Sequence, residues 1–71
     1  MNRIPVDSSM IASIGYDKNA RILEIEFAGK SHAVWQYKAV PPEEYSALMN
    51  AHSKGKYFHS NIRGIYAEEK Q

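Results

Sequence analysis

Residues 21–27 read RILEIEF, which is the clearest alternation of apolar and charged side chains in the chain. Three apolar residues fall on one side of an extended backbone, namely Leu23, Ile25 and Phe27. Glu24 and Glu26 fall on the other side. A period of two residues predicts a β-strand with one buried and one solvated face. We therefore interpret the two glutamates as a solvated strand face and not as a catalytic pair of carboxylates.

A second alternating segment precedes this one and predicts a hairpin. One face carries Met10, Ala12, Ile14 and Tyr16, and the other carries Ile11, Ser13 and Gly15. The intervening DKNA, residues 17–20, has turn chemistry, because Asp and Asn side chains hydrogen-bond nearby backbone groups. We expect strands at residues 10–16 and 21–27 joined by this turn, after an extended lead-in at residues 1–7.

A third strand is expected at residues 32–40, after the short AGK loop at residues 28–30. Gly29 suits a three-residue hairpin loop with one left-handed position. The strand ends at Val40-Pro41-Pro42, because proline has no amide proton and holds the preceding residue extended. The three strands form an antiparallel meander.

The length of the second loop decides which way Trp35 and Tyr37 face. A three-residue loop pairs Ile25 with Ala33 and Leu23 with Trp35, and it places both aromatic residues on the buried face. A two-residue loop reverses this result and displays them as an aromatic platform. The sequence leaves both registers open.

Two short helices are expected after the sheet. Residues 42–52 place four side chains on one helical face, namely Tyr45, Leu48, Met49 and His52. Ser53 is the expected N-cap of a second helix at about residues 56–63, with Phe58, Ile62 and Ile65 on its apolar side. Residues 67–71 are expected to form a frayed tail. The prediction is an α+β fold, a three-stranded antiparallel meander followed by two short helices packed on one sheet face.

The chain is long enough for one domain. Its 71 residues are 44% hydrophobic and 24% charged, close to an average globular composition. We expect a single domain over residues 1–71 with an ordered core at about residues 6–66. The absence of cysteine excludes thiolate metal sites and thiol catalysis, and we expect a cytoplasmic location. No segment has the apolar run of a signal peptide or of a membrane span.

A series of short motifs resembles the KTSC domain family. They are Ser8-Ser9, IGYD at 14–17, LEIEF at 23–27, WQY at 35–37, Val40-Pro41, Tyr45, SKGKYF at 53–58 and Ile62-Arg63. That family is named for the C-terminal extension of some lysyl-tRNA synthetases and also occurs as free-standing small proteins in bacteria and phages. The resemblance covers roughly residues 6–66, and the synthetase context implies RNA binding. Trp35 stands where the family usually has tyrosine, so a role that needs that hydroxyl is not expected here.

Metal and catalytic sites are not expected. His32, His52 and His59 show no ligand spacing such as His-x3-His. Ser8 and Ser9 are interpreted as hydrogen-bonding residues at a strand entry and not as nucleophiles. The glycines are isolated and form no phosphate-binding loop. We therefore expect no enzyme activity, no cofactor and no metal.

The region with the most binding potential is basic and aromatic. Residues 30–63 contain five Lys or Arg against two Glu, whereas the whole chain has a net charge of +1. Single-stranded RNA is held by aromatic rings that stack on bases and by cations that neutralise phosphates. The candidates for such a surface are Trp35, Tyr37, Lys38, Lys54, Lys56, Tyr57 and Arg63. The same cations also suit a solvated surface, and the aromatic residues also suit a core.

A protein-interaction module is the alternative function. The first or the third strand of a three-stranded sheet must lie at an edge, and an exposed edge accepts a strand from a partner or from a second copy of the chain. The expected partners are therefore RNA, or else a protein or a homodimer, and no membrane. RNA binding depends steeply on salt because counterions are released, whereas edge pairing does not.

Overall fold

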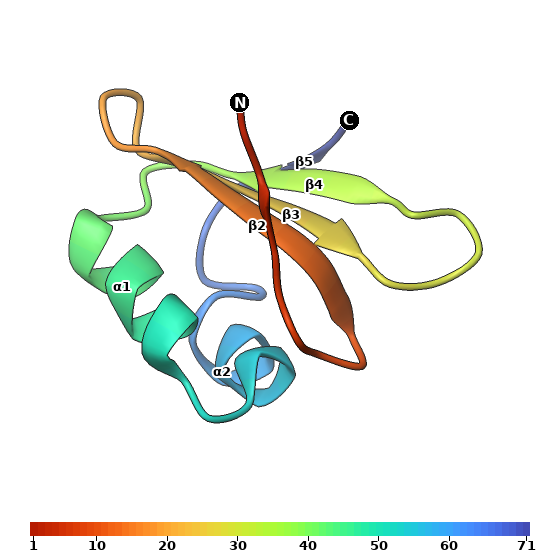
Figure 1. Ribbon diagram of the computed structural model, residues 1–71. Helices are drawn as coiled ribbons and strands as arrows, with labels where there is room; N and C mark the ends of the chain where they lie inside the picture. Colours follow the sequence, from red (N-terminus) through yellow and green to blue (C-terminus); the bar gives the residue numbers. More distant parts are fainter.

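The sheet has five strands, and both helices lie on one of its faces (Figure 1). The computed structural model describes residues 1–71. The strands are β1 (Ile4–Pro5), β2 (Ile11–Asp17), β3 (Ile22–Phe27), β4 (Val34–Tyr37) and β5 (Glu68–Lys70), and the helices are α1 (Pro42–Asn50) and α2 (Lys54–Asn61). All pairings are antiparallel and follow chain order. The α+β class is confirmed. The predicted three-stranded sheet lacks two strands of the observed sheet, β1 and β5.

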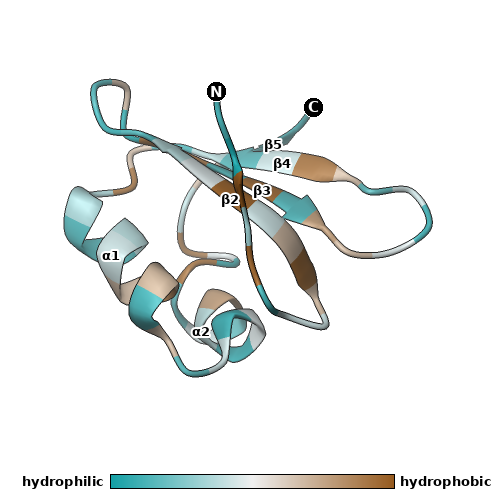
Figure 2. Ribbon diagram, in the orientation of Figure 1, coloured by the Kyte–Doolittle hydropathy of each residue, from teal (hydrophilic) through white to brown (hydrophobic).

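The core lies between the sheet and the two helices. Its nine residues are Ile11, Ile14, Leu23, Ile25, Tyr37, Val40, Leu48, Phe58 and Ile62. Figure 2 shows apolar segments on β2, β3 and β4 interrupted by hydrophilic ones, as a period of two residues requires. Leu23 and Ile25 are fully buried, which confirms the face predicted for them.

A β-bulge at the start of β2 changes the face of its first residue. The register shifts between Ile11 and Ser13, so Ile11 pairs with Phe27 while Ser13 pairs with Glu26. A bulge inserts one extra residue, and Ile11 therefore joins Ile14 in the core. The predicted alternation holds beyond the bulge and is wrong for Ile11.

The connection between β3 and β4 is longer than predicted but has the same parity. Ile25 pairs with Trp35 and Leu23 with Tyr37, which leaves residues 28–32 as the loop. An odd loop length keeps Trp35 and Tyr37 on the face of Leu23 and Ile25. The three-residue alternative is therefore right about the face, although each pairing is displaced by two residues.

Two short strands cover the edges that the predicted meander leaves open. β1 pairs with β2, and β5 pairs with β4. The strands of the meander are therefore interior, residues 67–71 are not a frayed tail, and the ordered sheet extends beyond residues 6–66 at both ends. The new edge strands are short, because β1 has two residues and β5 has three. β1 contains a proline and β5 consists of charged residues, and both features discourage pairing with another strand.

Helix α1 packs on the sheet through an aromatic pair. The rings of Tyr45 in α1 and Tyr16 in β2 stack with their centroids 4.8 Å apart. Leu48 is buried one turn later, as predicted. The helix ends at Asn50, two residues before the predicted end at His52, because the chain becomes extended at its C-cap. Neither helix is long and apolar enough to cross a membrane.

Helix α2 begins at Lys54, two residues earlier than predicted. Ser53 is its N-cap, as expected, and its Oγ accepts a 3.3 Å hydrogen bond from the amide of Lys56. Phe58 and Ile62 are buried in the core between the helices and the sheet. Ile65 is 64% exposed, so its predicted place on the apolar side is wrong.

The N-terminal segment crosses the face of the sheet that carries no helix (Figure 1). Arg3 donates through Nη1 to Oε2 of Glu24 at 2.6 Å and through Nε to Oγ of Ser13 at 3.0 Å. Gly15 makes room for this crossing, since a Cβ there would lie 2.9 Å from the carbonyl oxygen of Asn2. Glu24 is only 7% exposed, so its prediction as part of a solvated face is wrong.

Candidate functional site

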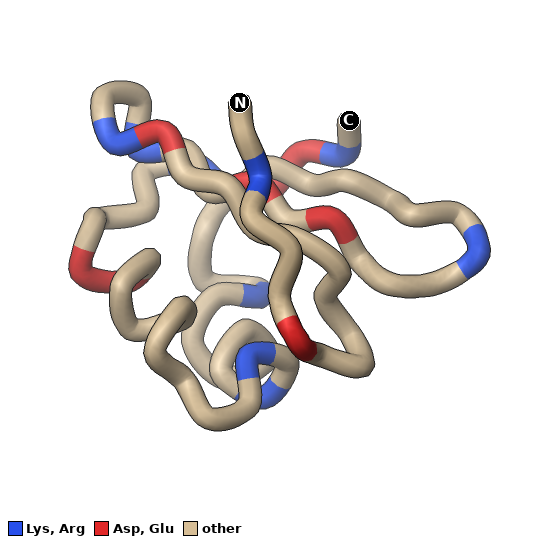
Figure 3. Tube along the Cα trace, viewed as in Figure 1, with Lys and Arg blue, Asp and Glu red and all other residues tan.

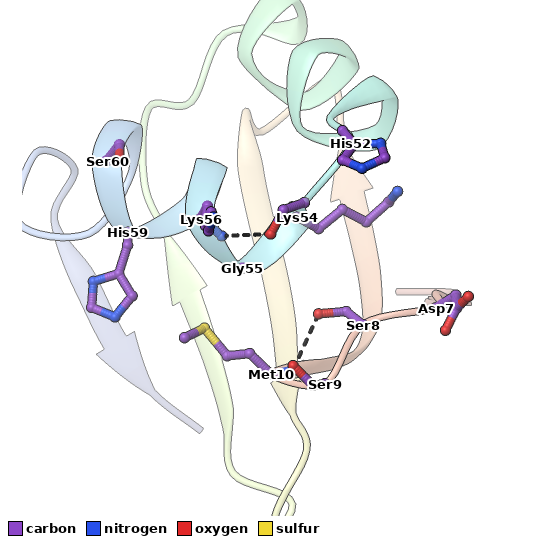
Figure 4. Close-up of a pocket in the computed structure, with 11 residues that line it drawn as sticks. Asp7, Ser8, Ser9, Met10, His52, Lys54, Gly55, Lys56, His59 and Ser60 are labelled. Carbon is purple, nitrogen blue, oxygen red and sulfur yellow. Dashed lines mark hydrogen bonds between the residues drawn. The ribbon is translucent and has the colours of Figure 1, made fainter.

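A groove runs between the loop that precedes β2 and the first turn of α2 (Figure 4). Its volume is about 700 Å³. The loop contributes Ser8, Ser9 and Met10, and the helix contributes Lys54 and Lys56. The fold thus places two of the three predicted lysines, Lys54 and Lys56, opposite a serine pair from the N-terminal part of the chain.

Two serine hydroxyls hold the walls of the groove in place. Ser53 caps α2, and Oγ of Ser8 accepts hydrogen bonds from the amides of Met10 and Ile11, both at 3.2 Å. Gly55 lets the walls approach, because a Cβ there would lie 3.3 Å from the Cβ of Met10. The interpretation of Ser8 as a strand-entry residue is confirmed.

The groove is basic. Lys54, Lys56, His52 and His59 line it, and Asp7 is its one acidic residue. Figure 3 shows blue but no red segments along α2. The first amides of a helix have no acceptor within the helix and carry partial positive charge. An anion is therefore the ligand that the groove suits best.

A smaller pocket of about 320 Å³ adjoins the groove, and Met10 and His59 line both. We call it the aromatic pocket, because its other walls include Phe27, Trp35, Tyr37 and Phe58, with Arg63 and Glu68 completing it. Three of the predicted binding residues, Trp35, Tyr37 and Arg63, meet here. The pocket and the groove together hold five of the seven.

The two aromatic residues predicted as a pair have different surroundings. Tyr37 is 2% exposed and meets Phe58 edge to face, with ring centroids 5.4 Å apart. Burial and the negative charge of Glu68 raise the pKa of Tyr37 to about 12. Trp35 is only partly buried and takes part in none of the ring contacts in the chain. Trp35 packs against the core and stays partly accessible, whereas the ring of Tyr37 belongs to the core.

Two of the predicted binding residues line neither the groove nor the aromatic pocket. Nζ of Lys38 pairs with Oε1 of Glu69 at 3.2 Å, at the edge formed by β4 and β5. Tyr57 donates its hydroxyl to Oε1 of Glu44 at 2.5 Å and so joins α2 to α1. That hydrogen bond is the largest cause of a raised pKa of about 12 for Tyr57, and burial is the second cause. Both residues have structural partners of their own.

The three histidines lie apart. Nδ1 of His32 is 3.4 Å from Oε2 of Glu26 on the face without helices, whereas His52 and His59 line the groove. Nowhere in the chain do three His, Asp or Glu side chains converge as a metal site requires. The histidines therefore contribute to the groove as separate polar groups.

Five residues that line the aromatic pocket are absent from the predicted set, namely Met10, Phe27, Phe58, His59 and Glu68. Helical spacing is the signal for His59, which follows Lys56 by three residues on α2. Nε2 of His59 also lies 3.4 Å from Nη1 of Arg63. Glu68 has no such signal, because only the pairing of β5 with β4 brings it to the pocket.

Comparison with known proteins gives consistent matches over most of the chain. The model of the KTSC domain matches residues 7–66. An uncharacterized protein of Stutzerimonas stutzeri is 47% identical over 58 residues, which cover 82% of this chain and 79% of that protein. A lysine–tRNA ligase of Nostoc punctiforme is 36% identical over 63 residues, which cover 89% of this chain but 11% of the ligase. The crystal structure of a KTSC domain protein from Yersinia pestis has a TM-score of 0.94 and 41% identity, and the match covers 99% of this chain and 96% of that one.

The matched span contains the site as well as the fold. Residues 7–66 include all of the groove and every wall of the aromatic pocket except Glu68. The structural match extends over nearly the whole of both chains. These matches confirm the resemblance read from the sequence, and the chain belongs to the KTSC domain family.

Proposed function

We propose that this domain is a non-enzymatic binding domain for single-stranded nucleic acid, with RNA as its ligand. A base enters the aromatic pocket and stacks on Trp35, while the adjoining phosphates lie in the basic groove. The observation that carries the proposal is the junction of the two cavities, where Met10 and His59 line both. Single-strand binding needs an aromatic face and a cationic track at neighbouring positions.

The two halves of the site supply different contributions. A base stacked on an aromatic ring contributes about 1–3 kcal/mol to binding, and any of the bases can stack in this way. Lys54 and Lys56 supply charge at the start of α2, where the helix amides also favour an anion. The isoelectric point of about 8.0 indicates a local basic site rather than a uniformly basic protein.

The relatives give the proposal a context. One of them is named as a lysine–tRNA ligase, and the part similar to this chain is 11% of its length. We extend the RNA context of that relative to this chain, and the groove and the aromatic pocket support this step on physical grounds.

A titration with a short RNA tests the proposal. Trp35 is the one tryptophan of the chain and lines the pocket, so its fluorescence reports directly on a stacked base. We expect quenching by a single strand of about ten nucleotides. If Lys54 and Lys56 each contact a phosphate, affinity falls about sevenfold from about 50 to about 200 mM salt.

Matched variants locate the contacts. Lys54→Ala and Lys56→Ala should each reduce the salt slope by about 0.7, the value for one phosphate contact on a single strand. Lys18→Ala removes an exposed lysine from the turn between β2 and β3 and should leave the slope unchanged. Equal slopes in all three variants, or no quenching at low salt, would contradict the proposal.

A protein partner or a second copy of the chain is the competing ligand. The strands of the predicted meander are interior, so such pairing has only β1 and β5 to use. β1 has two residues, of which Pro5 lacks an amide proton, and β5 has three charged residues. Short, charged or proline-containing edges resist strand addition, and we therefore place nucleic acid first. Light scattering that showed a dimer, without any RNA binding, would reverse this order.

A further inference from the structure

One residue that lines the aromatic pocket has a polar group without a partner in the chain. Tyr37 is 2% exposed, yet its hydroxyl makes no hydrogen bond within the protein, while those of Tyr16, Tyr57 and Tyr66 do. Every fully buried polar side-chain atom in the chain has a partner. The hydroxyl oxygen of Tyr37 is therefore not fully enclosed, and Tyr37 lines the aromatic pocket. Its ring belongs to the core, and its oxygen is free to bond a ligand in the pocket.

Two opposite charges line the pocket together with Tyr37. Glu68 is paired with Tyr37 in the pairing of β5 with β4, and Arg63 is also a lining residue. The carboxylate of Glu68 raises the pKa of Tyr37 and the guanidinium of Arg63 lowers it, in addition to the larger effect of burial, so both charges act on the hydroxyl. The pocket thus combines an anionic acceptor, a cationic donor and a hydroxyl that serves as either.

Glu68 is unexpected in a site for phosphate. A carboxylate repels phosphate, whereas it accepts hydrogen bonds from the N–H groups of a base. The volume of about 320 Å³ is at the small end for ligand pockets and suits one planar heterocycle. The carboxylate of Glu68 therefore suits the edge of a base better than it suits a phosphate.

We propose that the aromatic pocket selects guanine, with Glu68 accepting from N1–H and the 2-amino group and with Arg63 and Tyr37 facing O6 and N7. Guanine places two adjacent donors beside two acceptors. Adenine offers no adjacent pair of donors, and uracil has a single donor between two acceptors. This inference rests on the proposed function, because it assumes that a base enters this pocket.

Strands that differ in one base test the selection. Oligouridine of about ten nucleotides is prepared with a central guanosine, adenosine or inosine, and the fluorescence of Trp35 is followed. We expect the guanosine strand to bind about tenfold tighter than the adenosine strand, the low end for one bidentate contact. Inosine keeps N1–H and O6 but lacks the 2-amino group, so it should fall between them. Guanosine monophosphate in a parallel titration distinguishes a free nucleotide from a strand.

Two variants assign the reading to Glu68 and Tyr37. Glu68→Gln should abolish the preference for guanosine over adenosine, because an amide presents only one acceptor oxygen. Tyr37→Phe should reduce the preference without loss of fold, since the buried ring is kept. Glu69→Gln is the control, because that carboxylate pairs with Lys38 away from the pocket.

The outcomes separate the two proposals. Binding of all strands with equal affinity, or a preference unchanged in Glu68→Gln, overturns guanine selection and leaves strand binding standing. No binding of any strand together with binding of guanosine monophosphate overturns strand binding and supports the guanine pocket. No binding of either ligand overturns both.

Discussion

Arg3 and Glu24 form a 2.6 Å ion pair on the face of the sheet that has no helix. The other carboxylate oxygen of Glu24 accepts a 2.9 Å hydrogen bond from Nε2 of Gln36. A central strand thus holds a charged side chain that is 10% exposed and has partners on both oxygens. The N-terminal segment is part of the fold because it supplies one of these partners.

Replacing Arg3 with alanine should destabilise the domain. The substitution removes a hydrogen bond to a charged group and leaves the carboxylate of Glu24 with one partner, which predicts a loss of about 1.5–3 kcal/mol in the free energy of unfolding. Urea denaturation measures this loss. Lys30→Ala, in an exposed loop without an ion pair, is the control and should change stability by less than about 0.5 kcal/mol. Equal losses in both variants would show that the ion pair contributes nothing.

The lowered pKa of Glu24 predicts that the free energy of unfolding depends on pH in acid. Burial raises the pKa of its carboxyl, but the hydrogen bonds from Gln36 and Arg3 and the charge of Arg3 outweigh burial and lower the pKa below 4.5. A carboxyl with a lowered pKa in the folded state stabilises the fold above its unfolded pKa, and this contribution is lost as pH falls through the folded pKa. The free energy of unfolding should therefore decrease below pH 4.5 more steeply in the wild type than in Glu24→Gln. Glu69→Gln, at an exposed position, should keep the slope of the wild type.

Gly15 is predicted to tolerate no side chain while the N-terminal segment is in place. A Cβ would lie 2.9 Å from the carbonyl oxygen of Asn2, so Gly15→Ala should destabilise the full chain by about 1–3 kcal/mol. In a chain that lacks residues 1–3 the same substitution should cost almost nothing, because the obstructing atoms are gone. Chemical denaturation of the four proteins measures the coupling as a double-mutant cycle. Equal costs in both backgrounds would place the strain elsewhere.

Local patterns in the sequence were sufficient to predict the buried face of β3 and the N-cap of α2. Leu23 and Ile25 face the core because alternation over a whole strand allows only one buried face. Ser53 is a cap because its side chain has the right length to accept from a first-turn amide. Both predictions depend on residues that are close together in the chain.

Other parts of the fold depend on contacts between distant residues. The bulge at Ile11 breaks the alternation without a glycine or proline to mark it. β5 has no strand pattern, and it forms because the last residues lie beside the free edge of β4. Glu24 resembles a solvated residue until Arg3 is placed over it. No local pattern contains these contacts.

The site shows the same division. Lys54 and Lys56 were predicted from their position near a helix start, and both line the groove. Trp35 and Tyr37 share a face, as one predicted register required, but their exposure differs because the helices cover Tyr37 more fully. Tyr57 follows Lys56 directly but lies around the helix from the groove, where it bonds to Glu44. Spacing along the chain therefore predicted that Lys54 and Lys56 lie close together, but it did not predict which way Tyr57 faces.

The carboxylate of Glu44 should govern the stability of the domain in alkali. Its Oε1 accepts from the hydroxyl of Tyr57 at 2.5 Å and its Oε2 accepts from Tyr66 at 3.1 Å, and the first of these bonds, with burial, raises the pKa of Tyr57 from 10.0 to about 12. A group with a raised pKa in the folded state stabilises the fold fully below its unfolded pKa, and this contribution is lost as pH rises through the folded value. The free energy of unfolding should therefore fall between about pH 10 and about pH 12. Glu44→Gln should lower the midpoint of tyrosinate absorbance for Tyr57 and flatten this fall, whereas Glu69→Gln should leave both unchanged. If the tyrosinate midpoint is the same in Glu44→Gln and the wild type, the hydrogen bond to Glu44 is not the cause of the raised pKa.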